Sequence, residues 1–121
     1  MLRYVELKSG QNDRGPAWIA RVKVSRSGNT VYFDGKALKR GGGISGNYID
    51  LETGEEYWVS GVKKDGSDRH WAGRGKVAIE KSAVAEYLTE IGQTVIDSTR
   101  LTISPDLLET DIERINELEN S

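Results

Sequence analysis

The chain begins with two segments in which apolar and polar residues alternate, the period-2 pattern of a half-buried β-strand. Residues 2–8 place Leu2 and Tyr4, followed by Glu6, on one face and Val5 and Leu7 on the other. Residues 17–25 place a larger apolar set on one face, namely Trp18, Ala20, Val22 and Val24. Each segment is therefore predicted to be a strand with at least one face in a core.

Two turns that contain glycine predict β-hairpins further along the chain. Asp34-Gly35 is typical of a two-residue hairpin loop, because both central positions favour a positive φ. Pairing across this turn is expected to bring Val31 opposite Leu38. Thr53-Gly54 predicts a second hairpin, whose return strand covers residues 55–63.

Two stripes of apolar residues at helical spacing follow the predicted strands. The first predicts a helix over residues 82–91, which Ser82 caps and Gly92 ends. Its apolar positions are Val84, Tyr87, Leu88 and Ile91. The second predicts a helix over residues 104–119, because Ser104-Pro105 is typical of a helix start. Its apolar positions are Leu108, Ile112, Ile115 and Leu118.

Together these elements favour a mainly β fold with minor α content. About six short strands joined by glycine turns indicate a small antiparallel barrel or curled sheet with one covering helix. A parallel βαβ arrangement is not expected. The predicted domains are a β-rich unit, residues 1–91, and an acidic C-terminal helical extension, residues 92–121. The helix at 104–119 is predicted either to pack on its own chain or to form a homodimer with a second copy.

Charge is distributed unevenly along the 121 residues, although the net charge is only −2. Residues 1–81 hold fifteen Lys and Arg against ten Asp and Glu, and residues 82–121 hold two against nine. The basic part is therefore expected to attract phosphates or acidic proteins, and the acidic tail to repel nucleic acid or to compete for the basic surface.

The composition excludes several kinds of chemistry. The chain has no cysteine, which rules out disulfides, thiolate metal sites and a cysteine nucleophile. No apolar run approaches the roughly 20 residues that span a membrane. The first residues alternate, unlike the continuous apolar centre of a secretory signal. A cytoplasmic protein that does not enter the membrane is expected.

The segment with the most unusual chemistry is residues 55–76, which holds the only histidine and two of the three tryptophans. Its cations and aromatics predict a non-catalytic binding module for an anionic ligand, with single-stranded nucleic acid as one class. The predicted contact residues are Lys63, Lys64, Arg69, His70, Trp71, Arg74 and Lys76. Cations of this kind bind phosphates while an aromatic ring, here Trp71 or Tyr57, stacks on a base. Lys36, Lys39 and Arg40 lie one hairpin away, and Trp58 is predicted in the core.

Two other interpretations stay open. A small hydrolase-like enzyme would use His70 as an acid or base oriented by Asp68, although no G-x-S-x-G elbow surrounds Ser60 or Ser67. A protein-interaction module would recognise an acidic partner or one that anchors a tryptophan, and a self-association module would pair with a second copy of the chain.

No metal or cofactor is expected. One histidine with scattered carboxylates lacks the ligand spacing of a zinc site. Residues 41–46 match G-x-G-x-x-G but precede a predicted strand, whereas dinucleotide binding needs a helix start there. Residues 73–76, GRGK, lack both the first glycine and the final hydroxyl residue of a phosphate loop.

The amino-acid sequence resembles that of a family of short, functionally uncharacterised bacterial proteins. The residues that carry the resemblance are 15–18 (GPAW), 31–40 (VYFDGKALKR), 46–76 and the predicted helix at 84–88. It covers about residues 1–91, and residues 92–121 lie outside it. The resemblance implies no established activity, so no functional residue follows from it.

Overall fold

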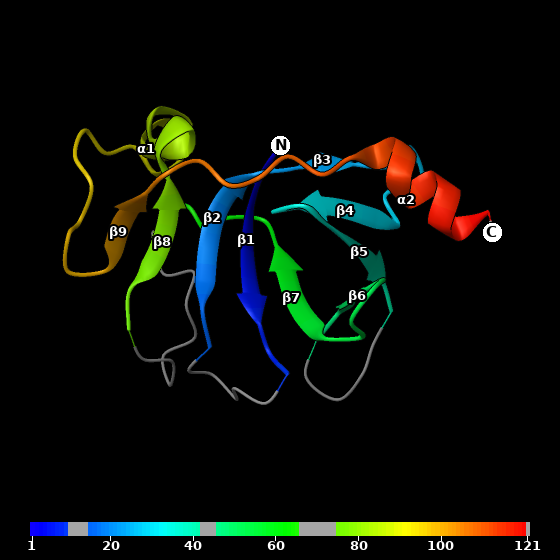
Figure 1. Cartoon of the computed structure of the whole chain (residues 1–121). Coiled ribbons are helices and arrows are strands. Elements are labelled where there is room, and N and C mark those ends of the chain that lie inside the picture. Colours follow the sequence, from blue (N-terminus) through cyan, green and yellow to red (C-terminus); the bar gives the residue numbers. More distant parts are fainter. Residues whose placement is uncertain (10–14, 42–45, 66–74, 121) are drawn as a thin grey trace.

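The computed structural model describes residues 1–9, 15–41, 46–65 and 75–120. Within these residues nine strands form one sheet in the order β3-β4-β5-β6-β7-β1-β2-β8-β9 (Figure 1). The strands are β1 (Leu2–Leu7), β2 (Ala17–Arg21), β3 (Lys23–Val24), β4 (Thr30–Phe33), β5 (Lys36–Arg40), β6 (Tyr48–Asp50), β7 (Glu56–Ser60), β8 (Val77–Glu80) and β9 (Leu101–Ser104). The helices are a 3₁₀ turn (Lys81–Ala83), α1 (Val84–Ile91) and α2 (Ile112–Glu119). The predicted mainly β fold is confirmed, with more strands than expected.

The sheet curls until strands far apart in its order touch across its inner face. The rings of Trp18 on β2 and Phe33 on β4 pack edge to face with centroids 5.2 Å apart, although four strands separate β2 from β4. The inner core enclosed in this way contains Val5, Ala20, Val22, Val31, Phe33, Leu38, Tyr48, Tyr57 and Val59, with Trp18, Leu7 and Val24 packed against it. The prediction that Trp18, Ala20, Val22 and Val24 share one face is therefore confirmed.

The opposite face of the sheet, which we call the α1 face, carries a second core. It contains Leu2, Tyr4, Ala17, Ile19, Val77, Ile79 and Leu101 of the strands, together with Ala83 and Tyr87. Helix α1 lies over this core beside β8 and β9 (Figure 1). Strand β1 contributes to both cores, because Leu2 and Tyr4 point to the α1 face while Val5 and Leu7 point inwards. The predicted distribution of these side chains between the two faces of the strand is confirmed.

Local turn chemistry forms the hairpins as predicted. Asp34 and Gly35 both have positive φ, 48° and 75°, and Val31 pairs with Leu38 across the turn. The Thr53-Gly54 turn joins β6 to β7, and Gly46, before β6, lies against the β7 backbone. A Cβ at Gly46 would stand 2.7 Å from the Tyr57 carbonyl oxygen, so only glycine fits this close approach.

Parallel pairing at one edge of the sheet corrects a prediction. Strand β2 pairs with β8, and β8 with β9, in parallel, and α1 lies in the connection between β8 and β9. This β8-α1-β9 unit is a βαβ crossover, which the sequence pattern did not favour. Strands β8 and β9 have only four residues each, too few for periodicity to indicate their partners.

Both helices begin at residues other than those predicted. Helix α1 begins at Val84 after the 3₁₀ turn, and the Ser82 side chain makes no capping hydrogen bond, although Gly92 ends the helix as expected. Helix α2 begins at Ile112, where Asp111 caps it by accepting a hydrogen bond from the Arg114 N–H at 3.2 Å. The prediction that this helix starts at Ser104-Pro105 is therefore wrong.

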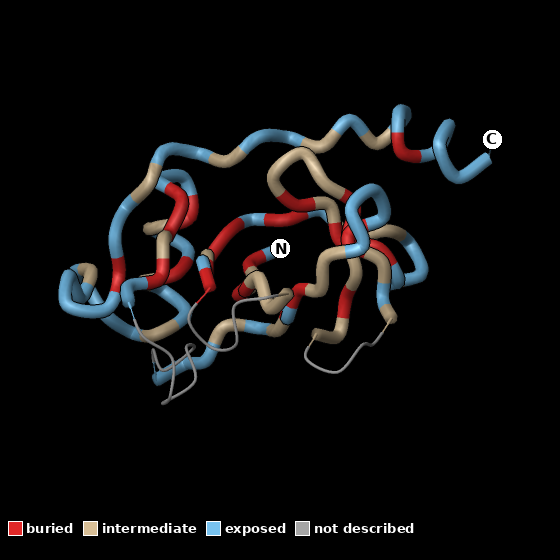
Figure 2. The backbone as a smooth tube through the Cα atoms, turned by 60° about the horizontal axis from the view of Figure 1, so that its bottom comes forward, coloured by how far each residue is buried: buried red, intermediate tan, exposed pale blue. Residues whose placement is uncertain are grey.

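Residues 105–111, which we call the strap, are extended instead of helical. Figure 1 shows them running from β9 over one end of the curled sheet to α2, and Figure 2 shows them mostly exposed above buried strands. The Leu107 N–H donates to Glu80 Oε2 at 2.9 Å, and the Leu108 N–H donates to Asp34 Oδ1 at 3.2 Å. These backbone N–H groups have acceptors elsewhere in the fold, so the strap needs no helical hydrogen bonds.

The C-terminal helix packs on its own chain. Ile115, at the centre of the predicted apolar stripe, is fully buried. The domain boundary at residue 92 and the homodimer through residues 104–119 stay predictions, and β9 belongs to the same sheet as β1 to β8. In the described ranges, no helix combines the length and the apolar character that a membrane span requires.

Candidate functional site

Three of the predicted contact cations are described, and all three are exposed, namely Lys63, Lys64 and Lys76. The other predicted site residues, Asp68, Arg69, His70, Trp71 and Arg74, lie outside the described residues. Val62 packs against the core of the α1 face, and Asp65 lines a cavity of about 410 Å³ beside α1. The segment that carries Lys63 and Lys64 therefore leaves β7 along the α1 face.

Trp58 on β7 is 42% exposed, so its predicted place in the core is wrong. Successive side chains of a strand point to opposite faces. Tyr57 and Val59 fill the inner core, which directs Trp58 to the α1 face. Among the aromatic side chains that the structure describes, only Trp58 is exposed to this extent.

Tyr57 cannot serve as the stacking ring that the sequence suggested. Its side chain is only 3% exposed, and its ring packs against Phe33 with centroids 6.4 Å apart. Burial, assisted by the negative charges of Glu55, Asp50 and Asp34, raises the pKa of Tyr57 to about 12. Trp58 takes its place as the candidate for stacking.

A buried polar cluster lies beside Trp58 on the α1 face. Glu6, the cross-strand partner of Trp58 on β1, is 2% exposed. The Tyr4 hydroxyl donates a hydrogen bond to Glu6 Oε1, and Lys8 Nζ stands 2.9 Å from Glu6 Oε2. A buried carboxylate is costly unless it is paired and hydrogen-bonded. Lys8 therefore balances the negative charge of Glu6 next to Trp58.

This cluster was missed by the sequence analysis, although a signal was present. Tyr4, Glu6 and Lys8 alternate along one strand and continue the face that begins with the apolar Leu2. A charged residue that shares a strand face with core residues is expected to be buried. When a residue of opposite charge follows two positions later on that face, the pattern indicates a buried ion pair.

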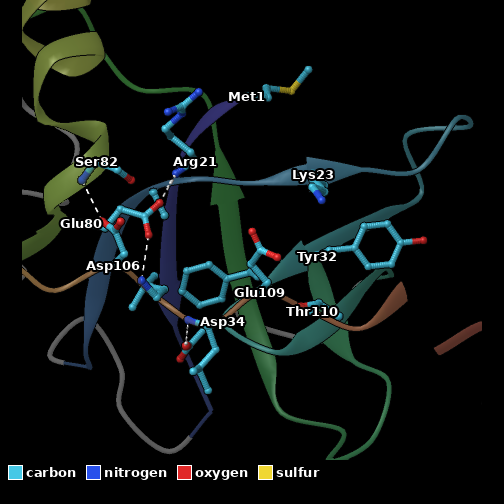
Figure 3. A pocket seen from close by; sticks show the side chains of 14 residues that line it. Met1, Arg21, Lys23, Tyr32, Asp34, Glu80, Ser82, Asp106, Glu109 and Thr110 are labelled. Carbon is cyan, nitrogen blue, oxygen red and sulfur yellow. Dashed lines mark hydrogen bonds between the residues drawn. The ribbon is translucent and has the colours of Figure 1, made fainter. Parts of the chain in front are cut away.

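A second concave site lies under the strap, as Figure 3 shows. The cavity has a volume of about 380 Å³ and is lined by strap residues and by residues of β2, β3 and β4, among them Arg21, Lys23, Tyr32 and Phe33. Its buried acid, Glu80, accepts the Arg21 N–H at 2.8 Å and the Leu107 N–H at 2.9 Å. Asp106 accepts the Ser82 N–H at 2.8 Å. These carboxylates hold the strap in place, so we assign them a structural role.

The cations of the β4–β5 hairpin have partners within the chain. Lys36 Nζ lies 3.5 Å from Asp34 Oδ2, and the Arg40 guanidinium lies over the Tyr48 ring at 5.9 Å. Lys39 forms an ion pair with Glu119, the last residue of α2.

A further ion pair ties α2 to the turn between β6 and β7. The Arg114 guanidinium donates two hydrogen bonds to the Glu52 carboxylate, at 2.8 and 3.1 Å. These hydrogen bonds hold the pKa of Glu52 below its usual value and raise that of Arg114. Both side chains are exposed, so water screens the interaction.

Within residues 1–9, 15–41, 46–65 and 75–120, no three His, Cys, Asp or Glu side chains are placed to hold a metal ion together.

Comparisons with known proteins do not identify a family for the chain. No family model matches it, and neither the curated proteins nor the solved structures give a match. The resemblance drawn from the sequence stays a prediction, and function is argued from the site alone.

Proposed function

We propose that this chain is a non-catalytic module that binds single-stranded nucleic acid. In this proposal Trp58 stacks on a base, and the exposed Lys63, Lys64 and Lys76 contact phosphates. The observation that carries the proposal is that Trp58 is 42% exposed on β7, a strand that has a neighbouring strand on each side. An exposed aromatic on a sheet face is the usual stacking platform of single-strand binding modules.

The surroundings of Trp58 support an anionic ligand. Lys63 and Lys64 follow β7 along the same face, because Val62 packs on the α1-face core. The nearest cross-strand acid, Glu6, is buried and paired with Lys8. A phosphate that approaches Trp58 therefore meets exposed lysines without an opposing free carboxylate on β1.

An exposed tryptophan also suits a protein partner, since such residues are enriched among the dominant contacts of interfaces. The two functions differ in their salt dependence. Binding to nucleic acid weakens steeply as salt rises, because phosphate contacts release counterions. Binding of a protein through an apolar tryptophan contact depends far less on salt.

The test is a fluorescence anisotropy titration of a labelled oligothymidylate and an oligouridylate with the full chain at low and high salt. Trp58→Ala is expected to weaken binding by roughly fivefold or more, because one stacked base contributes about 1–3 kcal/mol. Lys63→Ala with Lys64→Ala is expected to weaken binding and to flatten the salt dependence.

Two control variants match these changes. Val95→Ala removes an apolar side chain that is 74% exposed in the loop after α1, and Lys23→Ala removes an exposed cation on β3. Neither substitution is expected to alter the affinity more than twofold, because surface substitutions away from the binding residues have small effects. Absence of binding by the unaltered chain at low salt, or equal binding by Trp58→Ala, would overturn the proposal.

A further inference from the structure

We propose that α2 is an internal competitor for the nucleic acid: Glu119 occupies Lys39, a cation that otherwise extends the binding surface from Trp58 towards the β4–β5 hairpin. This inference rests on the proposed function. It assigns to the acidic C-terminal helix a role in limiting the affinity of the same surface.

Strand register puts Lys39 on the face that carries Trp58. Lys39 on β5 pairs with Ile49 on β6, and Ile49 pairs with Glu56 on β7. Paired residues of neighbouring strands share a face, and residues two apart in a strand do so too. Trp58 follows Glu56 by two positions. Since strands are about 4.8 Å apart, Lys39 lies roughly 10 Å sideways from the strand of Trp58.

The ion pair can exchange while the helix stays in place. Ile115 is fully buried, and Arg114 holds Glu52 through two hydrogen bonds, so α2 has attachments that do not involve Glu119. The side chains of Lys39 and Glu119 remain 40% and 30% exposed. An exposed ion pair is weak and screened by salt. A phosphate can therefore replace the Glu119 carboxylate at Lys39 without displacing the helix.

The experiment measures the affinity of full-length variants for oligothymidylate at about 50 mM salt and above. Glu119→Gln frees Lys39, and one further phosphate contact is expected to raise the affinity roughly fivefold and to steepen the salt slope by about 0.7. The matched control is Glu117→Gln, which removes the same charge from an exposed position of the same helix. It is expected to change the affinity less than twofold, because Glu117 has no described contact with the hairpin.

A double-mutant cycle separates this local competition from a general effect of charge. In a Lys39→Gln background, Glu119→Gln is expected to have no more effect than Glu117→Gln. Equal gains from Glu119→Gln and Glu117→Gln, or a gain that persists without Lys39, would overturn the inference. A thermal unfolding midpoint that stays near that of the unaltered chain excludes loss of helix docking as the cause of any gain.

The outcomes also distinguish the two proposals. If the unaltered chain binds, Trp58→Ala weakens binding and Glu119→Gln has no effect, only the competition is refuted. If neither the unaltered chain nor Glu119→Gln binds, the proposed function is refuted and the competition with it.

Discussion

The β4–β5 hairpin and the strap lie against each other, yet they take their conformations from different sources. The hairpin turn depends on Asp34 and Gly35 themselves, because this pair of residues favours the positive φ that both adopt. The strap depends on acceptors that are distant in sequence, above all Glu80 on β8. One region is therefore specified locally and the other by tertiary contacts, which predicts different responses to substitution.

The strap should be the more sensitive region when its main acceptor is removed. Glu80→Ala removes the acceptor of two partly buried N–H groups, those of Arg21 and Leu107, which lie 2.8 and 2.9 Å from the carboxylate in the intact protein. The expected loss in the free energy of unfolding is about 2–4 kcal/mol, because hydrogen bonds to a charged acceptor are among the strong ones. Urea unfolding measures this loss.

Glu109→Ala is the matched control for the strap, since this glutamate is exposed. It should change the free energy of unfolding by less than about 0.5 kcal/mol. Similar values for Glu80→Ala and Glu109→Ala would show that the strap does not depend on the buried carboxylate.

The hairpin should respond to a change in backbone preference alone. Gly35 has φ 75°, and a Cβ there would meet only Leu108 atoms at 3.8 Å, an ordinary contact. Gly35→Ala therefore introduces little crowding but strains the backbone, at an expected cost of about 1–2 kcal/mol. Gly61→Ala, at a position with open space and no positive φ, is the control. Equal effects of the two substitutions would argue against local control of the turn.

The smallest effect concerns acid pH and the Glu52–Arg114 pair at the far end of the strap. Because hydrogen bonds from Arg114 hold the pKa of Glu52 below its usual value, the stabilising contribution of the pair is complete above that usual value. It is lost as the pH falls through the lowered pKa of the folded state. The stability difference between the unaltered chain and Arg114→Ala should shrink in this window, as thermal unfolding at several pH values would reveal. A difference that is constant with pH would contradict the role of this pair.

Prediction from sequence succeeded where the determining residues are neighbours. The Asp34-Gly35 turn, the Val31–Leu38 pairing and the end of α1 at Gly92 all follow from short segments. It failed where distant acceptors determine the conformation. Ser104-Pro105 resembles a helix start, but the N–H groups that follow are bonded to Glu80 and Asp34.

The candidate site was predicted only in part, for a related reason. Alternation in β7 shows that Tyr57 and Trp58 face opposite ways, but it does not show which face is covered at that point. Tyr57 proved to be the buried ring and Trp58 the exposed one. The pairing of Lys39 with Glu119 joins residues that no local pattern connects.

The strap also has a consequence for the order in which the chain folds. The contacts of Leu108 with Asp34 and of Thr110 with Lys36 each span 74 residues. Contacts of such long range form only after a large loop has closed, so they come late. During synthesis the β4–β5 hairpin leaves the ribosome before the strap does, because the chain emerges from its N-terminal end. The inner core, against which Leu107 packs, is therefore not covered by the strap until residues 105–111 have been synthesised.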